Sequence, residues 1–304
     1  MSRDRDSGQW WSEAWSPVTG CTSAGAGCDH CWARAMVRRF PTLHGCDATV
    51  DHPKHGKIGA APTPFSTVRC HPDRLDKPLH WRKPRVVLVS MLGDLFHADV
   101  PDEFVRDVFE IMRRTPQHHY CVLTKRPQRA VLGRVRAANE WAAASMKCAP
   151  PRHWPHVLLM ASVWDQASAD AACAAFSTLP AGVRWGLHCE PMLGPVDAMR
   201  ALSAAGVTNL RKVAPTWIVC GGENGPGARP MDLHWALDLR AQCRAAGVPF
   251  WFKGGSKFSP EMSNEERSGL ESSRETPLLA QQAEAESWSP CAPTERRGCR
   301  WIPT

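Results

Sequence analysis

Three cysteines close together in the sequence are the residues best suited to chemistry. Cys21, Cys28 and Cys31 lie in the stretch Gly20–Trp32, which reads GCTSAGAGCDHCW. Six residues separate the first two cysteines, and two residues separate the last two. Because the longer gap holds only Thr, Ser, Ala and Gly, this loop can wrap a compact inorganic group and direct backbone N–H groups at it. Thiolates are soft ligands, so the pattern indicates an iron–sulfur cluster or zinc.

The choice between these metals depends on a fourth ligand. A structural zinc site is normally closed by four protein ligands. A [4Fe–4S] cluster held by three cysteines keeps one iron open, and that iron can chelate the amino and carboxylate groups of S-adenosylmethionine. Reduction then cleaves the sulfonium and yields a deoxyadenosyl radical. We favour the cluster; zinc remains the alternative, with a fourth ligand drawn from Asp29, His30, Cys46, Cys70 or His71.

Composition places this chain among ordinary globular proteins. It has 304 residues, of which 43% are hydrophobic and 22% charged, and it carries a net charge of +7. Residues 259–304 contain eight Glu and five Arg, so the positive excess lies in the rest of the chain. This basic body suggests an anionic partner such as DNA, RNA or a phosphate-bearing cofactor, although a basic surface without such a partner is equally compatible.

The cellular compartment follows from the cysteines and from the apolar segments. The start MSRDRDSGQWW lacks the apolar region of a signal peptide, and no apolar run approaches the length of a membrane span. We therefore expect a reducing cytoplasm and no membrane association. In such a compartment the clustered cysteines indicate metal ligation rather than disulfides.

Apolar runs alternate with segments of helical periodicity along most of the chain. Continuous apolar runs predict strands buried on both faces, and spacings of three and four predict helices. The predicted strands are Trp15–Gly20, Arg85–Ser90, His119–Thr124, Val157–Val163, Val183–Cys189, Trp217–Cys220 and Val248–Lys253. The predicted helices are Trp32–Phe40, Pro101–Arg114, Pro127–Ala144, Gln166–Leu179, Val196–Ala205 and Met231–Ala246.

This alternation predicts an α/β fold, a parallel (βα) barrel that is complete or nearly closed with about seven strands. The barrel would span residues 1–257, with the cysteine loop near its start and an excursion over residues 41–84. Residues 258–290 are rich in Ser and Glu and predict a flexible polar insert. Residues 291–304 regain apolar character and predict a segment that docks on the barrel.

Parallel barrels carry functional residues at the carboxyl ends of their strands, and polar residues follow most of the predicted strands. The candidates for cofactor binding are Ser90, Asp94, Ser162, Glu190, Gly221 and Gly222. The candidates for binding an anionic substrate are Lys125, Arg126, Glu223, Arg229 and Lys253. No catalytic residue is assigned.

Each candidate also has a structural interpretation. Asp94 could cap a turn, and Lys125 and Arg126 could be solvated. The glycines could form a tight turn, and Lys253 could pair with Glu223 or Glu190. His188 could perform acid–base chemistry or be structural. Most of the 14 tryptophans are expected to pack; Trp10, Trp11 and Trp164 are the candidates for base stacking.

Several stretches together resemble a phage-associated family of radical-SAM-like, three-Cys-motif proteins. They run from Trp15 to about Lys253 and read WSPVTGCTSAGAGCDHCWARAM, HPDRLDKPLHWRKPR, SMLGDLFHADVPDEF, VLTKRPQR, HCEPMLGPVD and GGENGPGARPM. The resemblance implies a radical-SAM barrel, a [4Fe–4S] cluster and S-adenosylmethionine. It further implies an external electron donor, a partner protein encoded nearby and, for a phage protein, the host cytoplasm. Modification or repair of nucleic acid is the expected reaction class.

The chain departs from this pattern in several places. Radical-SAM spacing usually puts three residues, not six, between the first two cysteines. The resemblance implies an acid after Ser162–Val163, where this chain has Trp164, and Asp165 is the neighbouring acid that could replace it. The last strand ends in a shorter aromatic motif, FWFKGG, and the Ser/Glu-rich segment is longer.

Three hypotheses therefore remain. The first is a radical S-adenosylmethionine enzyme acting on nucleic acid or a nucleotide-like substrate. The second is a zinc-stabilised nucleic-acid-binding phage accessory protein without redox chemistry. The third is a phage accessory protein that retains the fold without catalysis.

Overall fold

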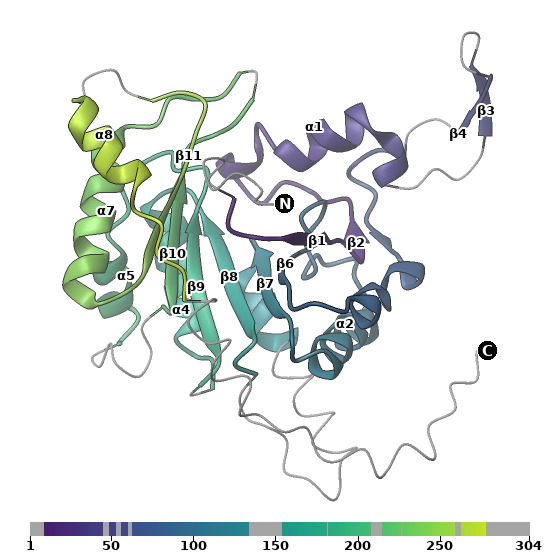
Figure 1. The fold of residues 1–304 in the computed structure, drawn as a ribbon, viewed down its shortest axis with the longest axis horizontal. Coiled ribbons are helices and arrows are strands. Elements are labelled where there is room, and N and C mark those ends of the chain that lie inside the picture. Colours follow the sequence, from purple (N-terminus) through teal and green to yellow (C-terminus); the bar gives the residue numbers. More distant parts are fainter. Residues whose placement is uncertain are drawn as a thin grey trace, which may run out of the picture.

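Seven parallel strands form one curled sheet, as expected from the alternating sequence pattern (Figure 1). The computed structural model describes residues 9–44, 49–52, 56–59, 63–133, 154–180, 182–207, 215–225, 227–258 and 263–277. The strands lie in the order β1-β6-β7-β8-β9-β10-β11. Their bounds are Glu13–Trp15, Val86–Val89, His119–Thr124, Val157–Val163, Arg184–Cys189, Trp217–Gly221 and Phe250–Gly254.

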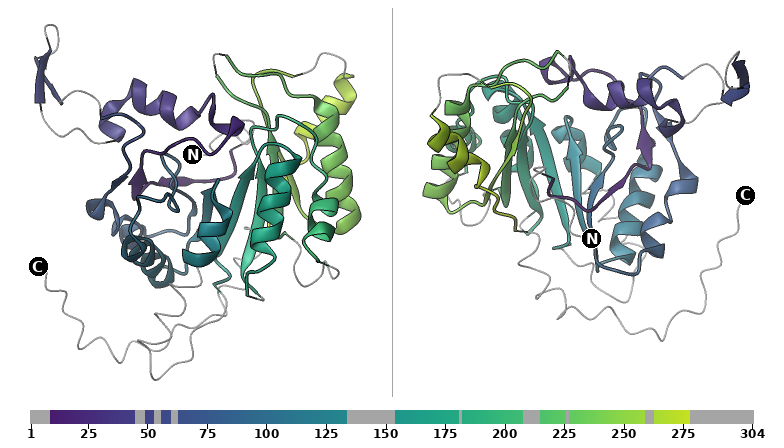
Figure 2. Two further views of the ribbon diagram at one scale, coloured as in Figure 1. Left: turned by 180° about the vertical axis from the view of Figure 1, so that it is seen from behind. Right: turned by 45° about the horizontal axis from the view of Figure 1, so that its top comes forward.

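Helices cover the outer face of this sheet, as the view from behind shows (Figure 2). They are α2 (Asp102–Arg114), α4 (Gln166–Phe176), α5 (Ala198–Ala204) and α7 (Leu233–Ala246). Their apolar faces bury one side of the sheet, including Val87 and Val89 of β6. Residues 127–133 are also helical; the rest of the helix predicted for Pro127–Ala144 lies outside the described residues.

The sheet is a half-barrel, and the prediction of a complete or nearly closed barrel is wrong. In the part of the chain described, β1 and β11 are the two edges and do not pair with each other. The free edge of β11 instead bonds residues 273–275, since Phe252 donates to the Ser273 carbonyl (2.8 Å) and Glu275 donates to the Phe250 carbonyl (2.9 Å). A non-strand segment therefore satisfies the backbone groups that closure would have used.

The predicted first strand, Trp15–Gly20, divides into two pieces. Residues Glu13–Trp15 form β1 and pair with β6, whereas Val18–Thr19 form β2 and pair with β5 (Arg69–Cys70) in a separate small sheet. Pro17 separates them and has no N–H to continue a ladder, while its carbonyl accepts from His71 (2.8 Å). This break directs the chain from the sheet to the cysteine loop.

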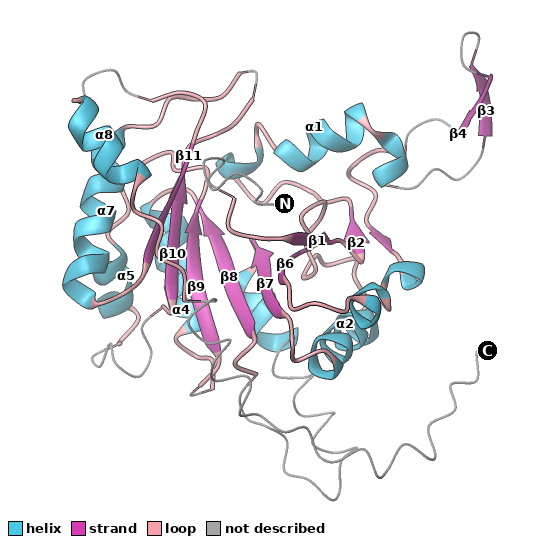
Figure 3. Ribbon diagram, viewed as in Figure 1, coloured by secondary structure: helices cyan, strands magenta, loops and turns pink. Residues whose placement is uncertain are grey.

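The described parts of the excursion over residues 41–84 contain only short elements (Figure 3). It includes β5, the hairpin of β3 (Thr49–His52) and β4 (Gly56–Gly59), and short 3-10 helices at Pro41–Leu43, Pro72–Arg74 and Lys77–His80. Helix α1 (Trp32–Arg39) precedes it, after a 3-10 turn at Ala26–Cys28 in the cysteine loop.

Part of the polar stretch predicted for residues 258–290 forms a helix that the sequence analysis did not predict. Helix α8 (Asn264–Glu271) begins with a capping box between Ser263 and Glu266, and its Leu270 is buried in the hydrophobic core. Residues 259–262 and 278–290 lie outside the described residues, as does the predicted docking segment 291–304.

The concave face of the half-barrel changes character along the strands. Alternate residues point inward, and those near the strand starts form an apolar cluster that includes Leu88, Leu158 and Val219. Trp10 joins this cluster, with its ring 4.9 Å from that of Trp217. Continuing the same alternation places polar side chains at the strand ends, where the candidate residues lie. None of the described helices is long and apolar enough to cross a bilayer.

Candidate functional site

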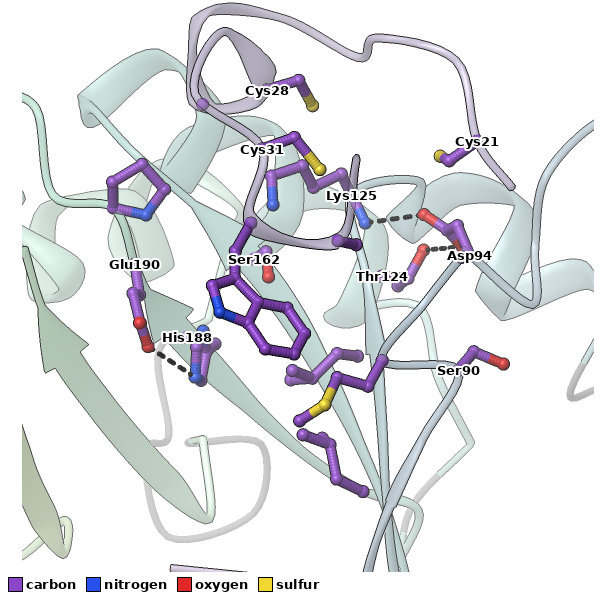
Figure 4. Close-up of a pocket in the computed structure, with 18 of the residues that line it drawn as sticks. Cys21, Cys28, Cys31, Ser90, Asp94, Thr124, Lys125, Ser162, His188 and Glu190 are labelled. Atoms are coloured by element: carbon purple, nitrogen blue, oxygen red, sulfur yellow. Dashed lines mark hydrogen bonds and ion pairs between the residues drawn. The ribbon is translucent and has the colours of Figure 1, made fainter. Parts of the chain in front are cut away.

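A cavity of about 370 Å³ opens at the carboxyl ends of the strands, on the concave side of the half-barrel (Figure 4). All three cysteines line it, together with side chains from six of the seven strand ends. The other predicted site residues that the cavity brings together are Ser90, Asp94, Lys125, Arg126, Ser162, Glu190, Gly222, Glu223 and Lys253. Its volume lies within the range of small-molecule and cofactor sites.

The Arg126 guanidinium fixes the Cys21 end of the loop. Its Nη1 lies 3.4 Å from Cys21 Sγ, and its Nη2 donates to the carbonyl (3.1 Å) and hydroxyl (3.2 Å) of Thr22. Burial raises the pKa of the Cys21 thiol, and the Arg126 charge opposes that rise. Arg126 therefore stabilises negative charge on the first cysteine, and the interpretation of Arg126 as a solvated residue is wrong.

Asp94 holds that arginine in place. Its carboxylate accepts from the Thr124 hydroxyl (2.8 Å), the Lys125 and Phe96 backbone N–H groups (3.1 and 3.0 Å) and Arg126 Nη1 (3.0 Å). Burial alone would lower the pKa of Arg126, but Asp94 and Cys21 raise it above its usual value. With four protein donors, Asp94 positions Arg126 against the cysteine loop.

A second ion pair fixes the other end of the loop. Glu223, which is 6% exposed, accepts from His30 Nδ1 (3.0 Å) and from the backbone N–H (2.8 Å) and side chain of Arg229. Arg229 in turn donates to the Ala26 carbonyl (2.8 Å) and to Asp29 (3.3 Å). Although burial raises the pKa of Glu223, its hydrogen bonds from Arg229 and His30 lower it overall. Glu223 and Arg229, both predicted to bind substrate, therefore anchor the turn that carries Cys28 and Cys31.

The glycines of the loop pack on the ring of Trp164. A Cβ added at Gly25 would lie 2.5 Å from Trp164 Cζ2, and one at Gly27 would lie 2.7 Å from Cε3. Trp164, which stands where the resemblance implies an acid, thus supports the loop. Asp165, the suggested replacement acid, instead caps α4 by accepting from the Ser168 N–H (2.8 Å).

Gly27→Ala is expected to displace the loop and to lower the iron bound after reconstitution by more than half, because the new methyl group overlaps the indole. Trp164→Ala in the same chain should restore most of that iron, since it removes the overlapping ring. Iron analysis of the single and double variants checks this coupling. An unaffected Gly27→Ala protein would contradict the contact, and Gly206→Ala, which has open space around it but a positive φ of 76°, serves as a remote control.

The floor of the cavity carries a partly buried ion pair between Lys253 and Glu190. Lys253 Nζ donates to Glu190 Oε1 (2.5 Å), and Glu190 Oε2 lies 3.3 Å from His188 Nε2. Burial raises the pKa of Glu190, but Lys253 and His188 bring it below its usual value. This confirms the ion-pair alternative for Lys253, whose Nζ also lies 5.4 Å from the centre of the Trp11 ring.

His188 makes stability depend on pH. Burial lowers its pKa from 6.5 to about 4, so the unfolded chain takes up the proton first and folding weakens as pH falls through 6.5 towards 4. Between pH 6.5 and 5 this one group should cost about 2 kcal/mol of unfolding free energy. In urea unfolding, the free energy of unfolding of His188→Gln should fall by about 2 kcal/mol less than that of the parent between pH 6.5 and 5. His80→Gln, at an exposed histidine, should keep the original slope, and parallel curves for both variants would refute the assignment.

Two serines and two glycines complete the predicted cofactor ligands. Ser90 has a positive φ of 57°, and its buried Oγ has no hydrogen-bond partner among the described residues. Backbone strain of this kind is often found at functional sites, but the Oγ itself is buried and does not open onto the cavity. Ser162 also lines the cavity, as does Gly222. Gly221 instead allows close packing, because a Cβ there would lie 2.8 Å from the Gly254 carbonyl.

Comparison with known proteins identifies the family. The family model described as "Protein of unknown function (DUF5131)" matches residues 6–283. The chain belongs to the DUF5131 family. No curated protein and no solved structure matches it. The description of the DUF5131 family states no activity.

The donor set of this DUF5131 site consists of three thiols, soft ligands that suit an iron–sulfur cluster or zinc. Within the described ranges, no three His, Cys, Asp or Glu side chains converge on one metal position, and the three thiols stand around the cavity mouth (Figure 4). Among the candidate fourth ligands, Asp29 and His30 are engaged by Arg229 and Glu223, and His71 contacts the Thr19 hydroxyl (2.7 Å). Cys46 lies outside the described residues.

Some supporting residues were missed by the sequence analysis. Thr19 Oγ1 contacts both His44 Nδ1 (2.8 Å) and His71 Nε2 (2.7 Å), and this buried group holds the strand that leads to Cys21. Thr22 Oγ1 contacts His97 Nε2 (2.7 Å) on the other side of the loop. The stretch GDLFH contains His97, but the spacing of that motif alone does not indicate its partner.

Proposed function

We propose that this protein is a radical S-adenosylmethionine enzyme that holds a [4Fe–4S] cluster on Cys21, Cys28 and Cys31. The observation that carries the proposal is the common cavity: three thiols on a small-residue loop face the polar carboxyl ends of six parallel strands. When bound and reduced, the cluster would supply an electron that cleaves S-adenosylmethionine to methionine and a deoxyadenosyl radical. The half-barrel fold supports this proposal. That the half-barrel is of the radical-SAM type is itself part of what we propose.

The chain's own residues would prepare the site in three ways. Arg126 and the Ala24 N–H, which lies 3.4 Å from Cys28 Sγ, stabilise thiolate charge. The Asp94–Arg126 and Glu223–Arg229 pairs fix the two ends of the loop. Ser162 offers a hydroxyl group to the cofactor, and the Gly222 backbone can approach it closely.

The substrate would be an anionic molecule, either nucleic acid or a nucleotide-like compound. Lys125 lines the cavity and offers a cation to phosphate or carboxylate groups, whereas the charge of Lys253 is paired with Glu190. The reaction would be modification or repair, in the cytoplasm or in a host cytoplasm for a phage protein. It requires an external electron donor, and a protein encoded nearby is a candidate partner.

Anaerobic reconstitution with iron and sulfide tests this proposal against the zinc alternative. We expect a brown, oxygen-sensitive protein with about four iron and four sulfide per chain and broad thiolate-to-iron absorption. A colourless protein that retains one tightly bound zinc per chain would overturn the proposal and favour the zinc-stabilised binding protein.

A further inference from the structure

A second, basic groove adjoins the cavity on its outer side. Its volume is about 470 Å³, and it lies between helix α1 and residues 63–66. Arg34, Val37 and Arg38 line one wall, and the segment Thr63–Ser66 lines the other. Helix α1 carries three arginines and no acidic residue, so the groove is strongly positive.

The two groove arginines are available to a ligand. Arg34 and Arg38 are both exposed and lie four residues apart, on the same face of α1. Neither forms an ion pair with any described part of the chain, in contrast to Arg126 and Arg229. Ser23 and Ser66 add hydroxyl groups to the groove lining, whereas the hydroxyl of Thr22 is already bonded to His97 and Arg126. Paired guanidinium groups with neighbouring hydroxyls match the oxygens of consecutive phosphates.

The groove is continuous with the cavity that contains the cysteines. Cys21 and Phe65 line both, so a ligand lying in the groove passes directly over the cavity mouth. Trp32 also lines the cavity and is 44% exposed, which leaves an aromatic surface at this junction. Aromatic faces stack on unpaired bases of any sequence.

We propose that this groove binds the backbone of a single-stranded nucleic acid segment, with Arg34 and Arg38 contacting its phosphates while one unpaired base stacks on Trp32 at the mouth of the cavity. A single strand is required because the exposed Trp32 ring can stack only on a base that is not paired inside a duplex. The contacts are to phosphates, so binding is independent of base sequence. The role of the bound strand as substrate rests on the proposed function; the binding itself does not.

Fluorescence anisotropy of the full chain with labelled oligonucleotides tests the proposal. The probes are an oligo-dT strand and a mixed-sequence strand of equal length, titrated over a range of salt concentrations. The double variant R34Q/R38Q is expected to weaken binding of both strands by about tenfold or more. Its log–log salt dependence should be shallower by about 1.4, at roughly 0.7 for each lost phosphate contact.

The matched control is R114Q/R244Q, which removes the same charge from exposed arginines on the outer helices α2 and α7. This control should bind within about twofold of the parent, since general electrostatic attraction changes equally in both variants. Equal losses in the two double variants, unchanged binding in R34Q/R38Q, or no binding by the parent would each overturn the proposal. An effect of R34Q/R38Q only on reduction by an acidic electron-donor protein would also overturn it.

The outcomes separate this inference from the proposed function. The binding assay needs neither S-adenosylmethionine nor a reductant. A chain that binds oligonucleotides through the groove but cleaves no S-adenosylmethionine would support the groove and contradict the radical chemistry. A chain that cleaves S-adenosylmethionine but does not bind oligonucleotides would support the radical chemistry and overturn the groove proposal.

Discussion

Cys28→Ala is expected to reduce reconstituted iron from about four per chain to less than one, with loss of the brown colour. Cys28 is the most buried thiol of the loop, at 8% exposed, and it receives the Ala24 N–H. Losing one of three protein thiolates leaves two irons of a four-iron cluster without protein ligands. The triple change of Cys21, Cys28 and Cys31 to Ala should remove iron entirely. Iron and sulfide analysis measures both effects.

Cys70→Ala is the matched control, because Cys70 is half-buried like Cys21 and Cys31 but does not line the cavity. It should bind as much iron as the parent chain. Equal iron in the triple variant and the parent would show that the metal is held elsewhere, and the account of the loop would then fail.

Asp94→Ala is expected to lower the free energy of unfolding by about 3–5 kcal/mol. The change leaves the largely buried Arg126 guanidinium without its carboxylate and also removes the acceptor of the Thr124 hydroxyl and of two backbone N–H groups. In a domain of this size the loss corresponds to a fall in Tm of roughly 10 °C. Urea unfolding and calorimetry measure it.

The control for this change is Asp99→Ala, whose side chain is 67% exposed and lies near His97. Exposed carboxylates of this kind contribute within about 0.5 kcal/mol, so this variant should unfold like the parent. If Asp94→Ala proved equally mild, Asp94 would have to be a free cofactor ligand rather than the support of Arg126.

The strands were the most predictable part of the fold, for a physical reason. Buried parallel strands are continuous apolar runs, so the prediction His119–Thr124 for β7 is confirmed at both ends, as is Val157–Val163 for β8. Whether the sheet closes into a barrel was not predictable, because closure depends on which segment pairs with the free edge of β11. Residues 273–275 occupy that edge, and their sequence has no strand-like pattern.

The candidate site was also predictable only in part from the sequence. The position of polar residues after buried strands correctly brought Ser90, Lys125, Glu190 and Lys253 to one cavity. The contacts of Arg126 and Arg229 with the cysteine loop were not predictable, because that loop is more than 100 residues away from them in the sequence. Trp164 stood out in the sequence as a departure from a motif, and only its packing against the loop glycines explains why a large ring is present there.

Formation of 5′-deoxyadenosine is the most direct test of the central claim. The reconstituted full chain is incubated anaerobically with S-adenosylmethionine and a chemical reductant, and the products are separated by chromatography. The account predicts 5′-deoxyadenosine and methionine in amounts that require the reductant, and none from the triple cysteine variant. A fully loaded, reduced cluster that leaves S-adenosylmethionine intact would contradict the account and favour an accessory protein without catalysis.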